Sequence, residues 1–159
     1  MKKTTLGHIE YDGKWLMLYR DIDKGDGSQG KWLGVGGKCE PGETPRECFI
    51  REAFEETGIA LSDCRLCGAV DYINDMYVSE RMYLFTAYAD SAEFSECDEG
   101  ILRWIPREEI MSLNMWEGDK YFLEPMLKGE ENIAMTLTYH GDELTGFEPG
   151  VLRLGEEIL

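Results

Sequence analysis

Apolar residues fall into short runs along the chain, and turn-forming residues separate these runs. Near the N-terminus, the runs at residues 6–11 and 15–19 flank Asp12-Gly13-Lys14. An Asp-Gly pair between two apolar runs is a strong signal for a β-hairpin. Segments rich in aliphatic and aromatic residues predict further strands at residues 66–73, 82–88, 101–105, 133–139 and 144–147. The last two strands should pair around the turn His140-Gly141-Asp142.

The clearest helix is predicted over Pro45–Thr57, because the signals at its two ends agree. Thr44 is a good N-cap residue, and Glu47 three positions later completes a capping box. Pro45 suits the first helical position, and Gly58 suits the left-handed position that follows a helix. Successive helical residues are rotated by about 100°. This rotation predicts one apolar stripe against the sheet, formed by Ile50, Ala53, Phe54 and Thr57.

Shorter helices are predicted at residues 107–111 and at Asp119–Leu127. Strands that alternate irregularly with helices indicate an α/β domain with a mixed sheet. The sequence contains no internal repeat or linker-like segment, and 159 residues suit one domain. We therefore predict a single domain over residues 1–159.

The composition is typical of a cytoplasmic protein without a membrane partner. Hydrophobic residues make up 43% of the chain and charged residues 30%, but no run approaches the roughly 18 apolar residues of a membrane span. The basic start Met1-Lys2-Lys3 is not followed by the apolar segment of a signal peptide. The five cysteines are odd in number, which argues against a complete disulfide framework and for a reducing compartment.

Cys64 and Cys67 have the C-x-x-C spacing of some metal and redox sites. A zinc site needs a second pair of ligands, and neither His8 nor His140 lies at zinc-ligand spacing from these cysteines. We therefore interpret both as ordinary buried residues of a strand.

The formal net charge of −16 narrows the class of ligand. It disfavours a nucleic acid polymer, because that mode of binding needs clustered Lys and Arg side chains. A small phosphate ester can still bind if metal ions bridge it to carboxylates. The same charge disfavours nonspecific self-association, so we expect a monomer or a specific homodimer.

Three glutamates of the predicted helix, Glu52, Glu55 and Glu56, have i, i+3 and i+4 spacing. This spacing places their carboxylates within reach of one another, on the side opposite the predicted apolar stripe. Hard oxygen donors grouped in this way suit Mg²⁺ or Mn²⁺. A solvated acidic helix face is the alternative interpretation.

The segment before the helix favours the metal-site interpretation. The turn at residues 34–37 contains three glycines, which allow close backbone approach, and Glu43 adds a fourth acid just before the helix. Arg51 can order the neighbouring Glu52 through a charge-assisted hydrogen bond.

Residues 37–59 resemble the Nudix box at every defining position: Gly37, five residues, Glu43, seven residues, then Arg51-Glu52-Ala53-Phe54-Glu55-Glu56-Thr57-Gly58-Ile59. A pattern of this length is far more specific than a lone short glycine motif. The resemblance implies the Nudix fold, an α/β/α sandwich around a mixed β-sheet. It also implies Mg²⁺-dependent cleavage of a nucleoside diphosphate linked to another moiety, with Mn²⁺ as the alternative ion.

Carried over position by position, the resemblance implies a metal site built from the box. Its ligands would be Glu52, Glu55 and Glu56 together with the Gly37 carbonyl oxygen, and Glu43 would support them.

The resemblance also implies the catalytic groups, although the general base varies within the family. Arg51 would orient a glutamate, and Glu52 is the first candidate for the base. Glu55 or an acid outside the box is the alternative, and Glu99 is the candidate for that outside acid. Glu99 can also be an ordinary loop residue. Water would attack a bridging phosphorus in line, and Lys38 would stabilise charge or remain a solvated loop lysine.

Beyond the box, residues 6–147 resemble the MutT-like 8-oxo-dGTP diphosphatases, most clearly at residues 30–38 and in the segment that starts at Trp116. In that group a tryptophan and an aspartate of this segment hold the purine. The residues implied here are Trp116 and Asp119, with Tyr72 as a second wall; the alternative for Trp116 is an aromatic residue of the core. This chain departs from the animal members at Leu33, where they have a base-contacting asparagine, and at Gly118, where they have a second aspartate.

Other Nudix activities match the sequence less well. ADP-ribose hydrolases tend to carry a proline about 15 residues past their box, and this chain has none between Pro45 and Pro106. Tyr77 lies near the tyrosine of diadenosine polyphosphate hydrolases, so that activity stays open. Non-hydrolytic nucleotide-sensing Nudix modules usually lose box carboxylates, which are all present here. We therefore predict a purine nucleoside triphosphate pyrophosphohydrolase that converts 8-oxo-dGTP to the monophosphate and pyrophosphate.

Overall fold

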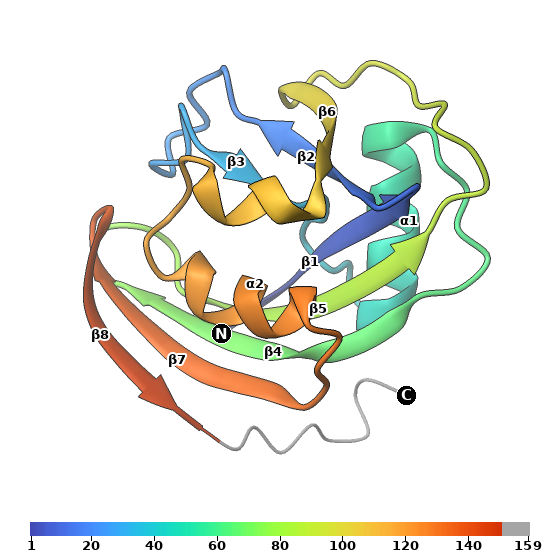
Figure 1. The fold of residues 1–159 in the computed structure, drawn as a ribbon. Helices are drawn as coiled ribbons and strands as arrows, with labels where there is room; N and C mark the ends of the chain where they lie inside the picture. Colours follow the sequence, from blue (N-terminus) through green and yellow to red (C-terminus); the bar gives the residue numbers. More distant parts are fainter. Residues whose placement is uncertain (151–159) are drawn as a thin grey trace.

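The computed structural model describes residues 1–150, and the last part of the predicted domain, residues 151–159, lies outside the described residues. The elements in chain order are β1 (Lys2–Tyr11), β2 (Lys14–Tyr19), β3 (Trp32–Leu33), α1 (Pro45–Thr57), β4 (Arg65–Asn74), β5 (Glu80–Tyr88), β6 (Ile101–Pro106), the 3-10 helix η1 (Arg107–Ser112), α2 (Asp119–Leu127), β7 (Ile133–His140) and β8 (Glu143–Pro149) (Figure 1). The predicted strands and the helices at α1 and α2 are confirmed. The helix predicted at residues 107–111 is a 3-10 helix, and the two-residue strand β3 was not predicted.

The strands form one mixed sheet of eight strands, in the order β3-β2-β1-β5-β4-β7-β8, with β6 paired to β2. The pairs β1–β5 and β4–β7 are parallel. The remaining pairs, including the two predicted hairpins, are antiparallel. The predicted mixed sheet is therefore confirmed.

Helices cover both faces of the sheet, with α1 on one side of β1 and β5 and η1 and α2 on the other (Figure 1). Side chains alternate between the two cores because successive residues of a strand point to opposite faces. In β2, Trp15 belongs to the core under α2, and the next residue, Leu16, belongs to the core under α1. The arrangement is the predicted α/β/α sandwich.

The boundaries of α1 follow the predicted signals. Thr44 accepts a hydrogen bond from the backbone N–H of Glu47, whose side chain accepts one from the backbone N–H of Thr44. Gly58 ends the helix in the left-handed conformation, with φ of 74°.

The apolar stripe of α1 was predicted incorrectly in part. Ala53 and Thr57 are buried as expected, but the Phe54 side chain is 56% exposed. Phe49 takes the inward position instead and stacks on Phe85 of β5, with 5.2 Å between ring centroids. The buried face is therefore turned toward Phe49, and this rotation brings Glu52 and Glu56 to its edge rather than to the opposite side.

Cys64 and Cys67 lie in different cores, Cys64 under α1 and Cys67 under α2, so their side chains do not face one another. All five cysteines are free thiols. No helix of residues 1–150 is long and apolar enough to span a membrane.

His8 of β1 is buried, with 1% of its surface exposed, and it stacks on Trp15 with 4.4 Å between ring centroids. Burial lowers the pKa of His8 from 6.5 to about 3. Below pH 6.5 the unfolded chain binds a proton that the folded protein excludes. The contribution of His8 to folding stability is therefore lost as the pH falls from 6.5 toward 3, at about 1.4 kcal/mol per pH unit.

We expect His8→Leu to remove this acid sensitivity. The free energy of unfolding, measured by urea titration at pH 7, 6 and 5, should fall less steeply in the variant than in the wild type. His140, the other histidine, is exposed and pairs with Asp75, which raises its pKa. His140→Gln is the matched control and should keep the steep acid-side loss; equal slopes in all three proteins would contradict the assignment to His8.

Candidate active site

The glycine-rich turn at residues 34–37 crosses β1 closely on its way to α1. The backbone N–H of Thr5 donates to the Gly37 carbonyl oxygen at 2.8 Å, and Gly7 and Val35 exchange two backbone hydrogen bonds. Gly36 has φ of 155°, and a Cβ built on it would lie 2.0 Å from the Thr5 carbonyl oxygen. Only glycine fits this position, because any side chain would collide with the backbone of β1.

The same turn accommodates two carboxylates of α1. A Cβ on Gly37 would lie 2.4 Å from the carboxyl carbon of Glu52, so the Glu52 side chain occupies the space that glycine leaves. The Glu56 carboxylate accepts a hydrogen bond from the backbone N–H of Gly36 at 3.3 Å. The glycines therefore serve two purposes, close passage over β1 and room for acidic side chains.

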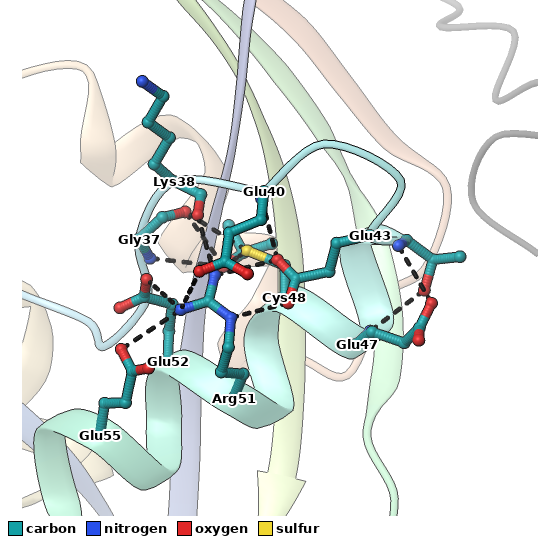
Figure 2. Close-up of polar contacts among 11 residues, drawn as sticks. Gly37, Lys38, Glu40, Glu43, Glu47, Cys48, Arg51, Glu52 and Glu55 are labelled. Atoms are coloured by element: carbon teal, nitrogen blue, oxygen red, sulfur yellow. Dashed lines mark hydrogen bonds and ion pairs between the residues drawn. The ribbon is translucent and has the colours of Figure 1, made fainter.

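Arg51 holds the acidic side chains around the start of α1 (Figure 2). Its guanidinium donates two hydrogen bonds to Glu43, at 2.7 and 2.9 Å, and one to Glu52 at 2.9 Å. A weaker contact of 3.2 Å reaches Glu55, and a further hydrogen bond of 3.1 Å reaches the Lys38 carbonyl oxygen. Bidentate pairing of this kind fixes geometry as well as charge, so Arg51 orients Glu52.

The carboxyl groups differ in their electrostatics. The hydrogen bonds from Arg51 lower the pKa of Glu43, whereas burial raises the pKa of Glu52. Burial raises the pKa of Glu56 from 4.5 to about 8, and the nearby charges of Glu52 and Glu99 add to the increase. Within residues 1–150, Glu56 forms no ion pair. An ionised Glu56 thus has no cation in direct contact among these residues, and the charge of Arg20 offsets only part of the increase in its pKa.

These donors suit a hard divalent cation. Glu52 and Glu56 supply carboxylate oxygens beside a backbone turn, and the uncompensated Glu56 is the group that a cation would stabilise most. As the side chains stand, no group of three His, Cys, Asp or Glu residues within the described part of the chain is arranged around one ion position. Figure 2 shows the Arg51 guanidinium between Glu43, Glu52 and Glu55, with which it forms ion pairs.

A cleft of about 700 Å³ joins this acidic cluster to an aromatic pocket. Glu52, Glu56 and Glu99 line its acidic end, and Tyr72, Trp116 and Asp119 line the other end. Among the remaining predicted residues, Leu33, Gly37 and Lys38 also line the cleft, whereas Glu43, Arg51 and Glu55 do not. The structure therefore brings most of the predicted site residues to one cleft and leaves Glu43, Arg51 and Glu55 outside its lining.

Glu99 reaches the cleft from the loop before β6 and is held by two cations. Arg20 contacts its carboxylate at 2.9 Å and Lys24 at 2.5 Å. The hydrogen bond from Lys24 is the main reason that the pKa of Glu99 lies below its usual value. Arg20 and Lys24 were not predicted as site residues, because nothing in their spacing indicates a shared contact with Glu99, which lies 79 positions from Arg20.

At the other end of the cleft, Trp116 is buried against two aromatic rings, Tyr72 and Tyr139, and one lysine, Lys31. Tyr72 meets its ring edge-on, with centroids 5.8 Å apart, and the Lys31 ammonium lies 4.6 Å above the ring. Asp119, the first residue of α2, is 6% exposed, and burial raises its pKa to about 8. The carboxyl group of Asp119 makes no hydrogen bond or ion pair within residues 1–150.

The model of the NUDIX domain matches residues 1–126 of this chain. The chain belongs to the Nudix family. A relative that covers most of both chains is the uncharacterized Nudix hydrolase YvcI of Bacillus subtilis, which is 37% identical over 145 residues, 87% of each chain. The oxidized purine nucleoside triphosphate hydrolase of Danio rerio is 30% identical over 62% of this chain and 64% of its own length. Among solved structures, the MutT protein of Bacillus halodurans superposes with a TM-score of 0.82 and 26% identity, over 93% of this chain and 97% of that one.

Membership of this family confirms the predicted class of enzyme, a Nudix hydrolase that acts on small nucleotide derivatives. Nudix hydrolases generally need divalent cations, which agrees with the chemistry of the Glu52 and Glu56 donors.

Proposed function

We propose that this Nudix hydrolase is a divalent-cation-dependent pyrophosphohydrolase of purine nucleoside triphosphates, with 8-oxo-dGTP as its main substrate. The observation that carries this proposal is the single cleft that has carboxylates at one end and an aromatic pocket with a buried acid at the other. A nucleoside triphosphate has the matching shape, with phosphates at one end and a flat base at the other. The similarity to the Danio rerio oxidized purine nucleoside triphosphate hydrolase supports a substrate of this class.

In this proposal the metal ion is Mg²⁺, with Mn²⁺ as the alternative, and Glu52 and Glu56 are its main protein ligands. Once bound, the ion neutralises phosphate oxygens and makes its water more acidic. The Gly37 carbonyl oxygen already accepts the Thr5 N–H at 2.8 Å, and the Thr5 hydroxyl and the Cys48 thiol donate weaker hydrogen bonds to it at 3.5 and 3.6 Å, so it is a poorer candidate ligand than the two carboxylates. Glu55 is exposed and lies outside the cleft, so it supports the site through Arg51 in this arrangement.

Glu52 is the best placed general base. It lines the cleft, and Arg51 binds one of its carboxylate oxygens, which fixes the direction of the other. Glu99 is a weaker candidate while Arg20 and Lys24 lower its pKa. Glu52 would remove a proton from the water that attacks phosphorus, and the products are the nucleoside monophosphate and pyrophosphate.

Pyrophosphate release in the presence of Mg²⁺ tests the proposal across a panel of 8-oxo-dGTP, the four dNTPs, ADP-ribose and diadenosine tetraphosphate. We expect 8-oxo-dGTP to have the highest kcat/KM. If another member were hydrolysed and 8-oxo-dGTP were not, the assignment of the aromatic end of the cleft to an oxidised purine would be contradicted, and the Nudix chemistry would still hold. If the wild type bound nucleotides but hydrolysed no member of the panel, and Glu55→Gln and Glu56→Gln bound them equally well, a nucleotide-sensing module would be favoured instead.

Trp116→Leu is expected to raise the KM for 8-oxo-dGTP about tenfold or more, because a stacked base contributes about 1–3 kcal/mol. The leucine keeps the position apolar, so kcat should change much less than KM. Tyr88→Leu removes an exposed aromatic ring that does not line the cleft, and it is the control. A Trp116→Leu enzyme with wild-type KM would place the base elsewhere.

The free thiols of all five cysteines suit a reducing compartment, so we propose that the enzyme is located in the cytoplasm. We further propose that residues 1–159 form a single domain, which is a monomer or a homodimer.

A further inference from the structure

The floor of the cleft at its aromatic end is a row of neighbouring residues on β1, β5 and β4. Glu80 of β5 pairs with Lys2 on β1 and with Tyr72 on β4, and all three line the cleft. Residues directly opposite each other in a sheet share a face, with Cβ atoms about 4.5–5.5 Å apart in antiparallel pairs. The Glu80 side chain therefore lies between a lysine and a tyrosine, on the surface where the base of a nucleotide would rest.

Asp119 reaches the same end of the cleft from the first turn of α2. After burial, the charge of Glu80 is the next cause of the raised pKa of Asp119, so the two carboxyl groups lie close enough to repel. Burial also raises the pKa of Glu80. Asp119 is 6% exposed and lines the cleft without a hydrogen-bond or ion-pair partner among the described residues.

Two partly or fully buried acids side by side are unfavourable for folding. A buried polar group without a partner costs free energy, and two like charges add to this cost. Of the two lysines nearby, Lys31 donates to the Gly27 carbonyl oxygen and covers Trp116. Lys2, opposite Glu80 on β1, and a hydrogen bond with the Thr4 side chain offset part of the increase in the pKa of Glu80. Asp119 thus has no donor of its own among the described residues, and a carboxylate such as Glu80 can accept more than one hydrogen bond, so the N–H groups of a ligand can satisfy Asp119 and the remaining lone pairs of Glu80.

We infer that Glu80 is a specificity-determining residue, which together with Asp119 selects a base that presents two adjacent N–H donors. A guanine-type base has such a pair in its N1–H and its 2-amino group, whereas adenine presents a single amino group. Carboxyl oxygens are the matching acceptors. This inference rests on the proposed function to the extent that a purine nucleotide occupies the cleft.

Binding of dGMP and of dIMP, which lacks the 2-amino group, tests the inference by calorimetry without any need for hydrolysis. The wild type should bind dGMP about tenfold or more tightly than dIMP, which is the effect of one charge-assisted hydrogen bond. Glu80→Gln removes the charge with almost no change in shape. It should lose about tenfold in dGMP affinity and most of the preference for dGMP over dIMP.

Glu148→Gln makes the same charge change at an exposed position of β8 that does not line the cleft, and should bind both nucleotides as the wild type does. Asp119→Asn is a second variant that should also narrow the preference, and circular dichroism checks that each variant is folded. Equal binding of dGMP and dIMP by the wild type, absence of binding, or an unchanged preference in Glu80→Gln would overturn the inference. Pyrophosphate release from 8-oxo-dGTP by the same preparation tests the proposed function separately.

Discussion

Replacing Glu56 with glutamine is expected to lower pyrophosphate release from the best substrate by about a thousandfold, which equals several kcal/mol of transition-state stabilisation. Glu56 is the carboxylate of the acidic end that has no ion pair among the described residues, and the Gly36 N–H alone orients it. Glutamine keeps the shape and the hydrogen bond but cannot neutralise a cation. Glu93→Gln, an exposed loop variant, is the control for the change in net charge.

The same variant should stabilise the metal-free protein at alkaline pH. The folded pKa of Glu56, about 8, lies above its ordinary value of 4.5. The stability that the neutral carboxyl contributes is therefore fully present below pH 4.5, and it is lost as the pH rises through 8. Glutamine stays neutral, so the free energy of unfolding of Glu56→Gln should exceed that of the wild type by about 2–4 kcal/mol at pH 9 and by little at pH 4.

Metal binding connects the two effects expected of Glu56→Gln, the loss of activity and the gain in stability at alkaline pH. Mg²⁺ should raise the melting temperature of the wild type, because a ligand that binds only the folded state stabilises it, and should raise that of Glu56→Gln much less. A variant with wild-type turnover, or with the same Mg²⁺-induced shift, would remove Glu56 from the metal site. A variant that is inactive but no more stable at pH 9 would show that the Glu56 carboxylate finds a partner in solution.

Features set by neighbouring residues could be predicted from the sequence. The ends of α1 depend on Thr44, Glu47 and Gly58, whose effects reach at most one helical turn, and these ends are confirmed. The hairpin turns depend on local Gly and Asp residues in the same way. The spacing of the Nudix box lies within one loop and one helix, so it indicated the acidic end of the cleft before any tertiary contact was known.

Features set by the packing of distant elements could not be predicted in the same way. The face of α1 that is buried depends on how Phe49 meets Phe85, and periodicity alone does not distinguish this face from the one that contains Phe54. Glu80 was missed because its role follows from cross-strand pairing with Tyr72 and from the approach of Asp119. A sequence contains no local signal for either relation.

Gly36→Ala is expected to destabilise the folded protein by about 2–6 kcal/mol and to abolish activity. A φ of 155° is strained for any residue with a side chain, which costs about 1–3 kcal/mol. The new methyl group would also lie 2.0 Å from the Thr5 carbonyl oxygen, so the turn must move away from β1, at a further cost of about 1–3 kcal/mol. Urea denaturation and pyrophosphate release measure the two effects.

Gly42→Ala separates the collision from the backbone strain. Gly42 also has a positive φ, of 80°, but a Cβ built there meets nothing within 4 Å. This variant should lose only about 1 kcal/mol of stability, within the usual cost of a left-handed residue, and should keep its activity. If Gly36→Ala were no less stable than Gly42→Ala, contact with β1 would not explain the glycine. If Gly36→Ala were destabilised by the expected amount but remained active, the hydrogen bond from Gly36 to Glu56 would be dispensable for positioning the carboxylate.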